Sequence, residues 1–375
     1  MPGPDPADLD ALVVGAGFSG LAVLHLLREQ GLRVRAYDAA GDVGGTWWWH
    51  GHPGSRLDTE CHLYQYAFSE PLFGEWGWSE RYPAGYEVQR WFRFVADRLG
   101  LRRDVELSTT ITGAHHDGER WTVHTDRGAV VHARSLVACT GRRPREAAAD
   151  VGAFAGTVLR TASWREDRHD LTGRRVGVVG TTGAAVQLVP WIVDAVAHLT
   201  VVADRPRDVA RRDNPHYGWR ERDAYRARFA ELRDGPPPAA PAPDRDAMRA
   251  RLADPRLAAL LVPDGAPGPV ALDDGWLEAF ARDHVDLVGA GDIARVGPRG
   301  LELADGTARA LDVLVVTADP DAGPPAHEDL GLPAGHPALS TVAAPGPGDV
   351  PCRHLEREAE RVAAAVVGRL TRVAR

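Results

Sequence analysis

The order of hydrophobic and polar positions in residues 11–38 predicts a strand, a helix and a second strand. Residues 12–14 form a short apolar run that enters a glycine-rich turn. Leucines follow at 21, 24 and 27, which is the spacing of one helix face. A second short run then ends on Asp38. The segment therefore predicts a βαβ unit that is followed directly by an acidic residue.

The turn between the first strand and the helix has the sequence Gly15-Ala-Gly17-Phe-Ser-Gly20. Gly15 permits a tight turn, Gly17 lets a pyrophosphate approach the backbone, and Gly20 lets the helix pack on the strand. The helix N-terminus offers free amides to phosphates, and Asp38 can accept both hydroxyls of a ribose. We expect a dinucleotide site here; the alternative is a glycine turn that only packs.

The same order of elements returns in residues 175–204, which predicts a second dinucleotide-type unit. A hairpin and strand over 120–141 predict a small meander on the first unit, and residues 301–319 repeat that pattern. Residues 339–348 and 356–373 predict a strand with a turn and a closing helix that return to the first unit. The predicted fold class is α/β, with two Rossmann-type dinucleotide-binding (FAD/NAD(P)-binding) domains, the second inserted in the first.

The predicted boundaries follow from this repeat. Residues 1–150 and 326–375 form the first domain, and 151–325 form a degenerate nicotinamide-type domain. The Arg-, Ala- and Pro-rich stretch of about 217–272 predicts a helical insertion, solvated rather than a mobile cap.

The glycine turn of the second unit departs from the pattern. Thr182 stands where close backbone approach needs glycine, and Ala185 replaces the last glycine. Asp204 at the ribose position would repel a 2′-phosphate, although Arg205 and Arg207 offset that charge. Two interpretations stay open: the unit binds NADH rather than NADPH, or it is a scaffold that binds no nicotinamide.

Residues 41–50 contain Trp47, Trp48 and Trp49 in succession. Three consecutive rings cannot all face one core from a helix or a strand, so we expect a planar ligand beside them. Trp91 lies in a helix-like segment and is expected in the core.

Composition narrows the functional classes. The 375 residues suit two domains, and the net charge of −8 argues against nucleic acid and anionic membrane partners. The chain has no lysine, which excludes Schiff-base chemistry, and its three separated cysteines give no metal-ligand spacing. No signal peptide or membrane span is predicted, and a cytoplasmic location is expected.

The run GGTWWWHGHPGSRLD (44–58), followed by YQYAFS, resembles the class B flavin-dependent monooxygenases of the Baeyer–Villiger branch. This resemblance implies that the first unit binds FAD and that the last helix, following residues 346–348, stabilises negative charge on the reduced flavin. It implies the following cofactor contacts: Gly15, Gly17, Phe18, Ser19, Gly20, Asp38, Gly45, Thr46, Trp47, Asp58, Tyr64, Ile111, Thr140, Gly141, Gly346 and Gly348.

The chain also departs from that family in its second half. The histidine of the linker fingerprint is Arg160, and the NADPH-reading run is replaced by Ala203-Asp-Arg-Pro206. The arginine expected before residues 274–280, which stabilises the anion formed on the flavin, is missing, and the ATG-type turn reads Thr317-Ala-Asp319. The residues expected to bind the flavin are therefore present, whereas those expected to bind the nicotinamide and to support oxygen insertion are replaced.

Three functional hypotheses follow. The first is an FAD-dependent monooxygenase that acts on a bulky apolar small molecule, in secondary metabolism, with altered use of NADH or NADPH or with a flavin reductase partner. The second is a repurposed FAD enzyme that uses no nicotinamide: an oxidase, a dehydrogenase or a redox-neutral cyclase. The third is a non-catalytic flavoprotein. The candidate catalytic residues are Asp58, His52 and Arg56, and the expected substrate walls are Trp47, Trp48, Trp49, Trp76 and Trp78.

Overall fold

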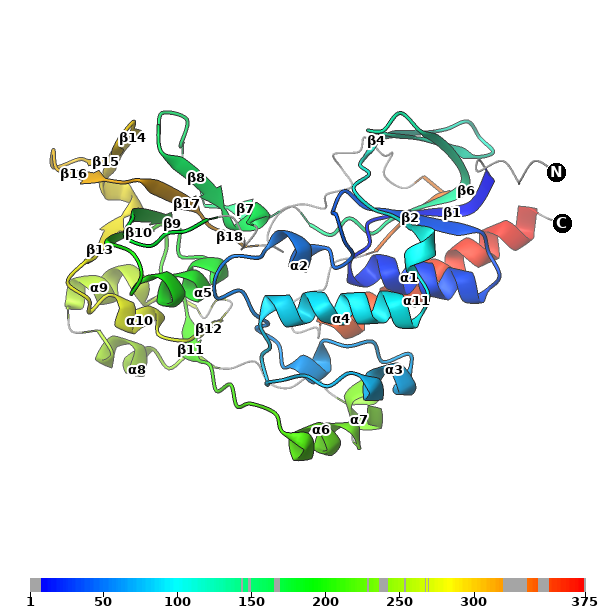
Figure 1. Ribbon diagram of the computed structural model, residues 1–375, viewed down its shortest axis with the longest axis horizontal. Helices are drawn as coiled ribbons and strands as arrows, with labels where there is room; N and C mark the ends of the chain where they lie inside the picture. The colour runs from blue at the N-terminus through cyan, green and yellow to red at the C-terminus, as the bar shows by residue number, and fades with distance from the viewer. Residues whose placement is uncertain are drawn as a thin grey trace.

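The computed structural model of the chain describes most of its length. The described residues are 8–142, 144–147, 150–164, 169–227, 229–235, 242–252, 254–266, 268, 270–319, 336–342 and 351–373. Two sheets with their helices form the two units, which lie side by side in Figure 1.

The first sheet combines parallel strands with an antiparallel meander. β1, β2, β3, β6 and β19 pair in parallel, whereas β4, β5 and β6 are antiparallel neighbours, which confirms the predicted meander. The strands run in the order β3 (Val105–Glu106), β2 (Val34–Tyr37), β1 (Asp8–Val14), β6 (Val130–Ala138), β5 (Trp121–Thr125) and β4 (Ile111–His116), and β19 (Leu339–Thr341) also pairs with β6.

Both faces of β1 are buried, which explains its uninterrupted apolar run. Ala11 and Val13 pack with the helices α1 (Phe18–Glu29), α4 (Gly85–Arg98) and α11 (Pro351–Val373). Leu12 and Val14 face the other way and pack with the meander. Figure 1 shows α1 and α11 next to each other below this sheet.

The second sheet is entirely parallel. Its order is β13 (Val285–Gly289), β10 (His198–Ala203), β9 (Arg175–Val179), β17 (Val313–Val316) and β8 (Thr157–Arg160). The helices α5 (Gly183–Ile192) and α10 (Trp276–Ala279) pack against it. Because β19 and α11 follow this unit in the chain but complete the first one, the fold is the predicted pair of Rossmann-type domains with the second inserted in the first.

Short elements connect and flank the two units. Phe229 of α7 packs on Phe73 of α3, so part of the predicted insertion lies against the first core. Two small antiparallel pairings, β14–β15–β16 and β7–β18, border the second sheet. These elements are α2 (Thr46–Trp49), α3 (Glu70–Glu75), α6 (Trp219–Arg226), α7 (Phe229–Asp234), α8 (Arg245–Ala250), α9 (Pro255–Leu261), β7 (Arg145–Glu146), β11 (Val209–Arg211), β12 (Ala271–Asp273), β14 (Ile293–Gly297), β15 (Gly300–Leu303), β16 (Ala308–Ala310), β18 (Ala318–Asp319) and the 3₁₀ turns Cys61–Leu63, Arg102–Asp104, Thr161–Ser163 and Ala290–Asp292.

Among the described residues, every helix is too short or too polar to cross a lipid bilayer.

Candidate functional site

The first glycine turn has no room for side chains. Gly15 has a φ of +103°, and a Cβ there would lie 2.4 Å from the carbonyl oxygen of Cys139. A Cβ on Gly20 would lie 1.9 Å from the carbonyl oxygen of Gly15. A Cβ on Gly17 would lie 3.3 Å from the Cα of Gly45, so the turn and the GGTW segment meet backbone to backbone. Gly15 and Gly20 are thus required by close approaches to backbone atoms, and Gly17 makes a tight contact with Gly45.

The N-terminus of α1 is open to an anion. In the described part of the chain, Gly17 is its N-cap, no side chain accepts a hydrogen bond from its first turn, and that turn carries no acidic residue. At the neighbouring end of β6, the Thr140 hydroxyl is buried without a hydrogen-bond partner among the described residues. Free helix amides beside an unpaired hydroxyl are the donors that a diphosphate uses. The residues present therefore fit the pyrophosphate of FAD.

Asp38 is held next to this turn by backbone amides. Its Oδ2 accepts from Ala16 N at 2.5 Å and its Oδ1 accepts from Ala40 N at 2.8 Å. Burial raises the pKa of this carboxyl, and the two amide hydrogen bonds oppose the rise. Each carboxylate oxygen has a second acceptor position, so Asp38 can still accept ribose hydroxyls.

Aromatic side chains adjoin the turn through the GGTW segment. Trp47 Nε1 donates to the Tyr64 hydroxyl at 2.7 Å, and the Tyr64 ring meets Phe18 edge to face at 5.8 Å. Trp48 is half-buried and lies against Gly41, whereas Trp49 is 36 % exposed. The three tryptophans sit on the single turn α2 and do not share one core, as their spacing predicted.

Two of the predicted walls belong to the core. Trp78 is fully buried and packs with Trp76, Trp91 and other core residues of the first unit, so its assignment to a substrate wall is corrected. Trp76 is partly buried against the same core. Ile111 is buried in the cluster between sheet and meander, whereas Gly346 and Gly348 lie outside the described residues.

Asp58 forms the centre of a charged cluster that joins the two units. Its Oδ1 accepts from Arg212 Nη2 at 3.1 Å and from Gln187 Nε2 at 3.2 Å. Arg212 has no exposed side-chain surface and also donates to Asp274 Oδ2 at 2.9 Å and to the Leu57 carbonyl at 2.6 Å. The cluster therefore places a buried, fully paired positive charge beside the flavin motif.

The Asp58 carboxylate is accessible but crowded. Although 46 % of its side chain is exposed, the protein atoms on its other sides desolvate it, and this raises the pKa of its carboxyl. The Arg212 guanidinium and the Gln187 amide oppose the rise. Neither partner was singled out from the sequence, because Arg212 and Gln187 lie 154 and 129 positions away from Asp58.

The other catalytic candidates have structural partners. Arg56 Nη1 donates to Glu80 Oε1 at 2.9 Å and to the Tyr82 carbonyl at 3.0 Å, and no described contact joins it to Asp58. His52 is buried with Nδ1 3.1 Å from the Pro53 carbonyl oxygen. Burial lowers the pKa of His50 and of His52 to about 4, so both rings are neutral at pH 7.

The second glycine turn is satisfied by its own side chains. Asp204 Oδ1 accepts from Thr181 N at 2.8 Å and from the Thr181 hydroxyl at 2.9 Å. Thr182 is fully buried, and its hydroxyl accepts from Ala185 N at 3.3 Å as the N-cap of α5. Its side chain was predicted to obstruct a pyrophosphate, and the structure shows that it also caps its own helix.

Asp319 stands where the ATG-type turn would have its glycine, and its carboxylate reaches the N-terminus of α5. Its Oδ1 accepts from Gly183 N at 3.0 Å, and its Oδ2 accepts from Arg207 Nη2 at 2.7 Å. Arg207 also donates through Nε to the Thr181 carbonyl at 2.6 Å. The N-terminus of α5 thus has a carboxylate partner, in contrast to that of α1.

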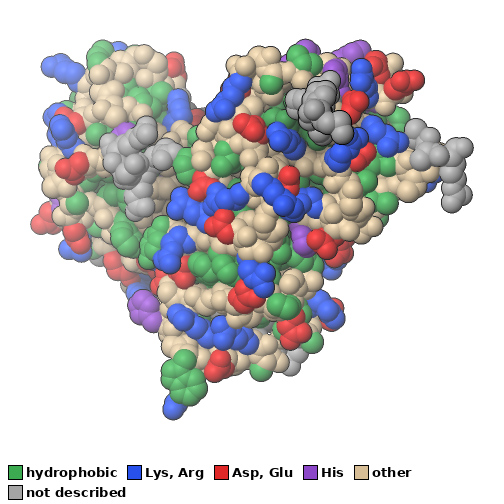
Figure 2. Space-filling view, turned by 45° about the vertical axis from the view of Figure 1, so that its right-hand side comes forward, with side chains coloured by type: hydrophobic (Ala, Val, Ile, Leu, Met, Phe, Trp, Pro, Cys, Tyr) green, Lys and Arg blue, Asp and Glu red, His purple; other side chains and the backbone are tan. Residues whose placement is uncertain are grey.

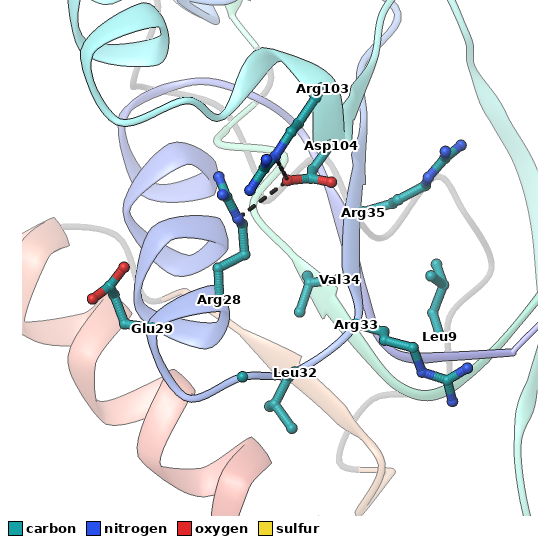
Figure 3. Close-up of a pocket in the computed structure, with 10 residues that line it drawn as sticks. Leu9, Arg28, Glu29, Leu32, Arg33, Val34, Arg35, Arg103 and Asp104 are labelled. Carbon is teal, nitrogen blue, oxygen red and sulfur yellow. Dashed lines mark ion pairs between the residues drawn. The ribbon is translucent and has the colours of Figure 1, made fainter.

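Surface shape adds two features. Figure 2 shows a notch between the two lobes of the molecule. A separate pocket of about 460 Å³ lies at the other end of β1 and β2 from the glycine turn. Figure 3 shows Arg28 and Arg103 of this pocket directed to Asp104, at 3.1 and 3.5 Å. Arg28 and Arg103 are thereby paired, and the pocket is distinct from the predicted flavin site.

Comparisons with known proteins agree with this geometry. Residues 13–73 match the family model of the NAD(P)-binding Rossmann-like domain. The chain is 37 % identical to acetone monooxygenase (methyl acetate-forming) of Gordonia sp. (strain TY-5), over 84 % of this chain and 71 % of the relative. It is 42 % identical to a Baeyer-Villiger monooxygenase of Pseudooceanicola batsensis, over 52 % of this chain but only 37 % of that relative.

Solved structures give the same result. Oxidized steroid monooxygenase bound to NADP matches 96 % of this chain and 86 % of that chain, with a TM-score of 0.85 and 29 % identity. Cyclohexanone-bound cyclohexanone monooxygenase matches 98 % and 88 %, with a TM-score of 0.87 and 25 % identity. With a relative that is 37 % identical over most of both chains, the protein belongs to the FAD-dependent Baeyer–Villiger monooxygenases.

Proposed function

We propose that this chain holds FAD in its first unit and oxidises an apolar small molecule as a monooxygenase of secondary metabolism, with altered or lost use of NADPH. The observation that carries the proposal is the buried Arg212 guanidinium next to Asp58, in the loop that follows the GGTW segment. It holds the Asp58 carboxylate in place beside this motif, where the arginine expected before Asp274 is missing from the sequence.

The proposed cofactor contacts follow the geometry of the first unit. The open N-terminus of α1 and the Thr140 hydroxyl would bind the pyrophosphate, and Asp38 would bind the ribose. Trp47 and Tyr64 would line the flavin ring. When bound, FAD supplies the redox centre that reacts with O2.

Asp58 would be the residue that exchanges a proton next to the flavin ring, and Arg212 would hold it in position. Arg212 is held by four acceptors and has no exposed side-chain surface, so it fixes the orientation of the Asp58 carboxylate rather than binding an anion itself. Asp58, with its raised pKa, is the group best placed to take up or release a proton. His50 and His52 are neutral and buried, so they position the loop instead.

The domain boundaries and the substrate class belong to this proposal. The division at 1–150, 151–325 and 326–375 is supported by the pairing of β19 with β6. The relatives are named for acetone, cyclopentanone and cyclohexanone, which favours a ketone as the substrate of this chain. Trp48 and Trp49 remain the proposed aromatic contacts for its apolar part.

A single-turnover experiment tests the reaction type without any coenzyme. The FAD-loaded protein is reduced with dithionite under argon and mixed with ¹⁸O2-saturated buffer that contains acetone or cyclohexanone. We expect an ester or lactone with one ¹⁸O atom, detected by mass spectrometry, and none from heat-denatured protein. Reoxidation that yields only hydrogen peroxide with both ketones would contradict a monooxygenase of ketones.

The second candidate is an FAD enzyme that uses no nicotinamide, such as an oxidase, a dehydrogenase or a redox-neutral cyclase. The contact of Asp319 with Gly183 N favours it over an NADH-dependent enzyme. In the same experiment, stoichiometric peroxide without a labelled organic product is its expected result.

A further inference from the structure

The structure assigns to Asp319 the place of a coenzyme phosphate: we infer that its carboxylate closes the second unit to NADH and NADPH. This inference rests on the proposed function, because it concerns how the proposed flavin site receives electrons. The N-termini of α1 and α5 occupy equivalent positions in the two units and differ in their hydrogen-bond partners.

The two glycine turns share one construction. In each turn, the backbone amide of the second residue donates a hydrogen bond to the carboxylate that follows the second strand. Ala16 N donates to Asp38, and Thr181 N donates to Asp204. In a unit of this kind the pyrophosphate lies at the N-terminus of the helix that follows. The two helix ends, of α1 and α5, are therefore the positions to compare.

Only one of these two ends is open. In the described residues, the first turn of α1 has no side-chain cap and no acidic partner. At α5, Asp319 Oδ1 accepts from Gly183 N at 3.0 Å and the Thr182 hydroxyl accepts from Ala185 N. Two of the amides that a pyrophosphate would use are thus already bonded inside the chain.

The carboxylate at this end is fixed and neutralised. Arg207 Nη2 lies 2.7 Å from Asp319 Oδ2, and Arg205 Nη2 lies 3.6 Å from the same oxygen. The Arg205 Nε is also 3.6 Å from Asp204 Oδ2, so two arginines and two aspartates form a neutral group. A diphosphate would add negative charge next to Asp319 and would compete for Arg207, which opposes binding.

The fold of the second unit is formed, so the closure is local to the turn and to the N-terminus of α5. The parallel sheet, the tight turn with Gly180 at a φ of +95° and the helix α5 are all formed. The linker position Arg160 is paired with Glu146 at 3.2 Å. Removal of the Asp319 side chain would free Gly183 N and leave Arg207 available for a phosphate.

The test compares wild type with Asp319→Gly and with Asp319→Asn, which keeps the size and the acceptor but removes the charge. Each FAD-loaded protein is mixed anaerobically with 1 mM NADH or NADPH while absorbance near 450 nm is followed. Binding of NADP⁺ and NAD⁺ is measured separately by calorimetry. Dithionite reduction of each protein is the control for an intact flavin.

We expect no calorimetric binding and no bleaching for wild type above the rate of free FAD with coenzyme. Asp319→Gly is expected to bind one coenzyme and to bleach at least tenfold faster than wild type, and Asp319→Asn to gain less. Bleaching or saturable binding by wild type would overturn the inference. The absence of any gain in whichever variants retain dithionite-reducible flavin would equally overturn the role of Asp319.

These results are separate from those that test the proposed function. A wild type that is reduced by NADPH and forms the labelled ester contradicts the closure by Asp319 and the loss of NADPH use, but not the monooxygenase reaction. A wild type that ignores both coenzymes but gives peroxide alone after dithionite reduction contradicts only the monooxygenase reaction.

Discussion

At the scale of single residues, Arg212 is the most constrained charge of the candidate site. Its guanidinium has no exposed surface and donates to two carboxylates and two backbone carbonyls. Arg211, next to it in the chain, is 72 % exposed and forms an ion pair with Glu278 on the surface. Arg211 and Arg212 are adjacent in the chain, so their replacement compares the loss of a surface ion pair with the loss of a buried one.

Replacement of Arg212 by methionine is expected to lower the free energy of unfolding by about 2 kcal/mol, because it leaves the buried Leu57 and Leu272 carbonyls without their donor. The matched control Arg211→Met should cost less than about 1 kcal/mol. Urea unfolding followed by tryptophan fluorescence measures both. Equal losses in the two variants would contradict the special position of Arg212.

The sequence predicted some of these residues and could not predict others. Gly20 and Asp38 were predicted because their contacts, with Gly15 and Ala16, lie within one βαβ unit. Arg212 and Asp319 contact Asp58 and Gly183 across 154 and 136 positions, and nothing in a local pattern specifies such contacts. Trp78 was misassigned because a buried and a ligand-facing indole have the same sequence signature.

At the scale of elements, the two strand–turn–helix units show how one pattern gives two outcomes. The apolar periodicity predicted both sheets and both helices, since burial of one face forms them in either case. Whether a helix end is open or capped depends instead on single side chains, here the local Thr182 and Asp319 from the distant strand β18. Fold class was therefore predictable from the sequence, and the state of the second site was not.

The close packing of α1 on β1 gives a test at this scale. Gly20→Ala would place a methyl group 1.9 Å from the Gly15 carbonyl oxygen, which is backbone and cannot move without opening the turn. We expect the purified variant to lose its flavin, measured as the ratio of absorbance near 450 nm to that at 280 nm.

Gly74→Ala is the matched control for this change. Gly74 lies inside α3, where an added Cβ meets no atom within 4 Å. Alanine favours helix over glycine by up to about 1 kcal/mol, so this variant should keep its flavin and its stability. Retention of full flavin by Gly20→Ala would contradict the tight contact.

At the scale of the whole molecule, α11 is fastened to the first unit by a buried acid. Glu356 Oε2 accepts from Ala67 N at 3.1 Å, and the side chain is only 5 % exposed. Burial raises the pKa of Glu356 to about 7, from a usual value of 4.5. The folded protein therefore binds this proton more tightly than the unfolded chain does.

Stability should consequently fall as the pH rises from about 4.5 to about 7, by an amount on the order of 3 kcal/mol from this group. Glu356→Gln removes the titration, so we expect the variant to exceed wild type in stability at pH 8 and to lose this advantage at pH 5. Urea unfolding at both pH values measures the difference. Glu360→Gln, on an exposed position of the same helix, should follow wild type at both, and a Glu356 variant that does so would refute the assignment.

The return of β19 and α11 to the first sheet has a consequence for biosynthesis. The second unit is continuous from Thr157 to Asp319, so a ribosome releases all of its strands before Leu339 of β19. Domains fold as units when their chain has emerged, which lets the inserted unit close first. Until α11 emerges, α1 lacks the helix that covers it, and we expect its exposed leucines to make the growing chain prone to aggregation at this stage.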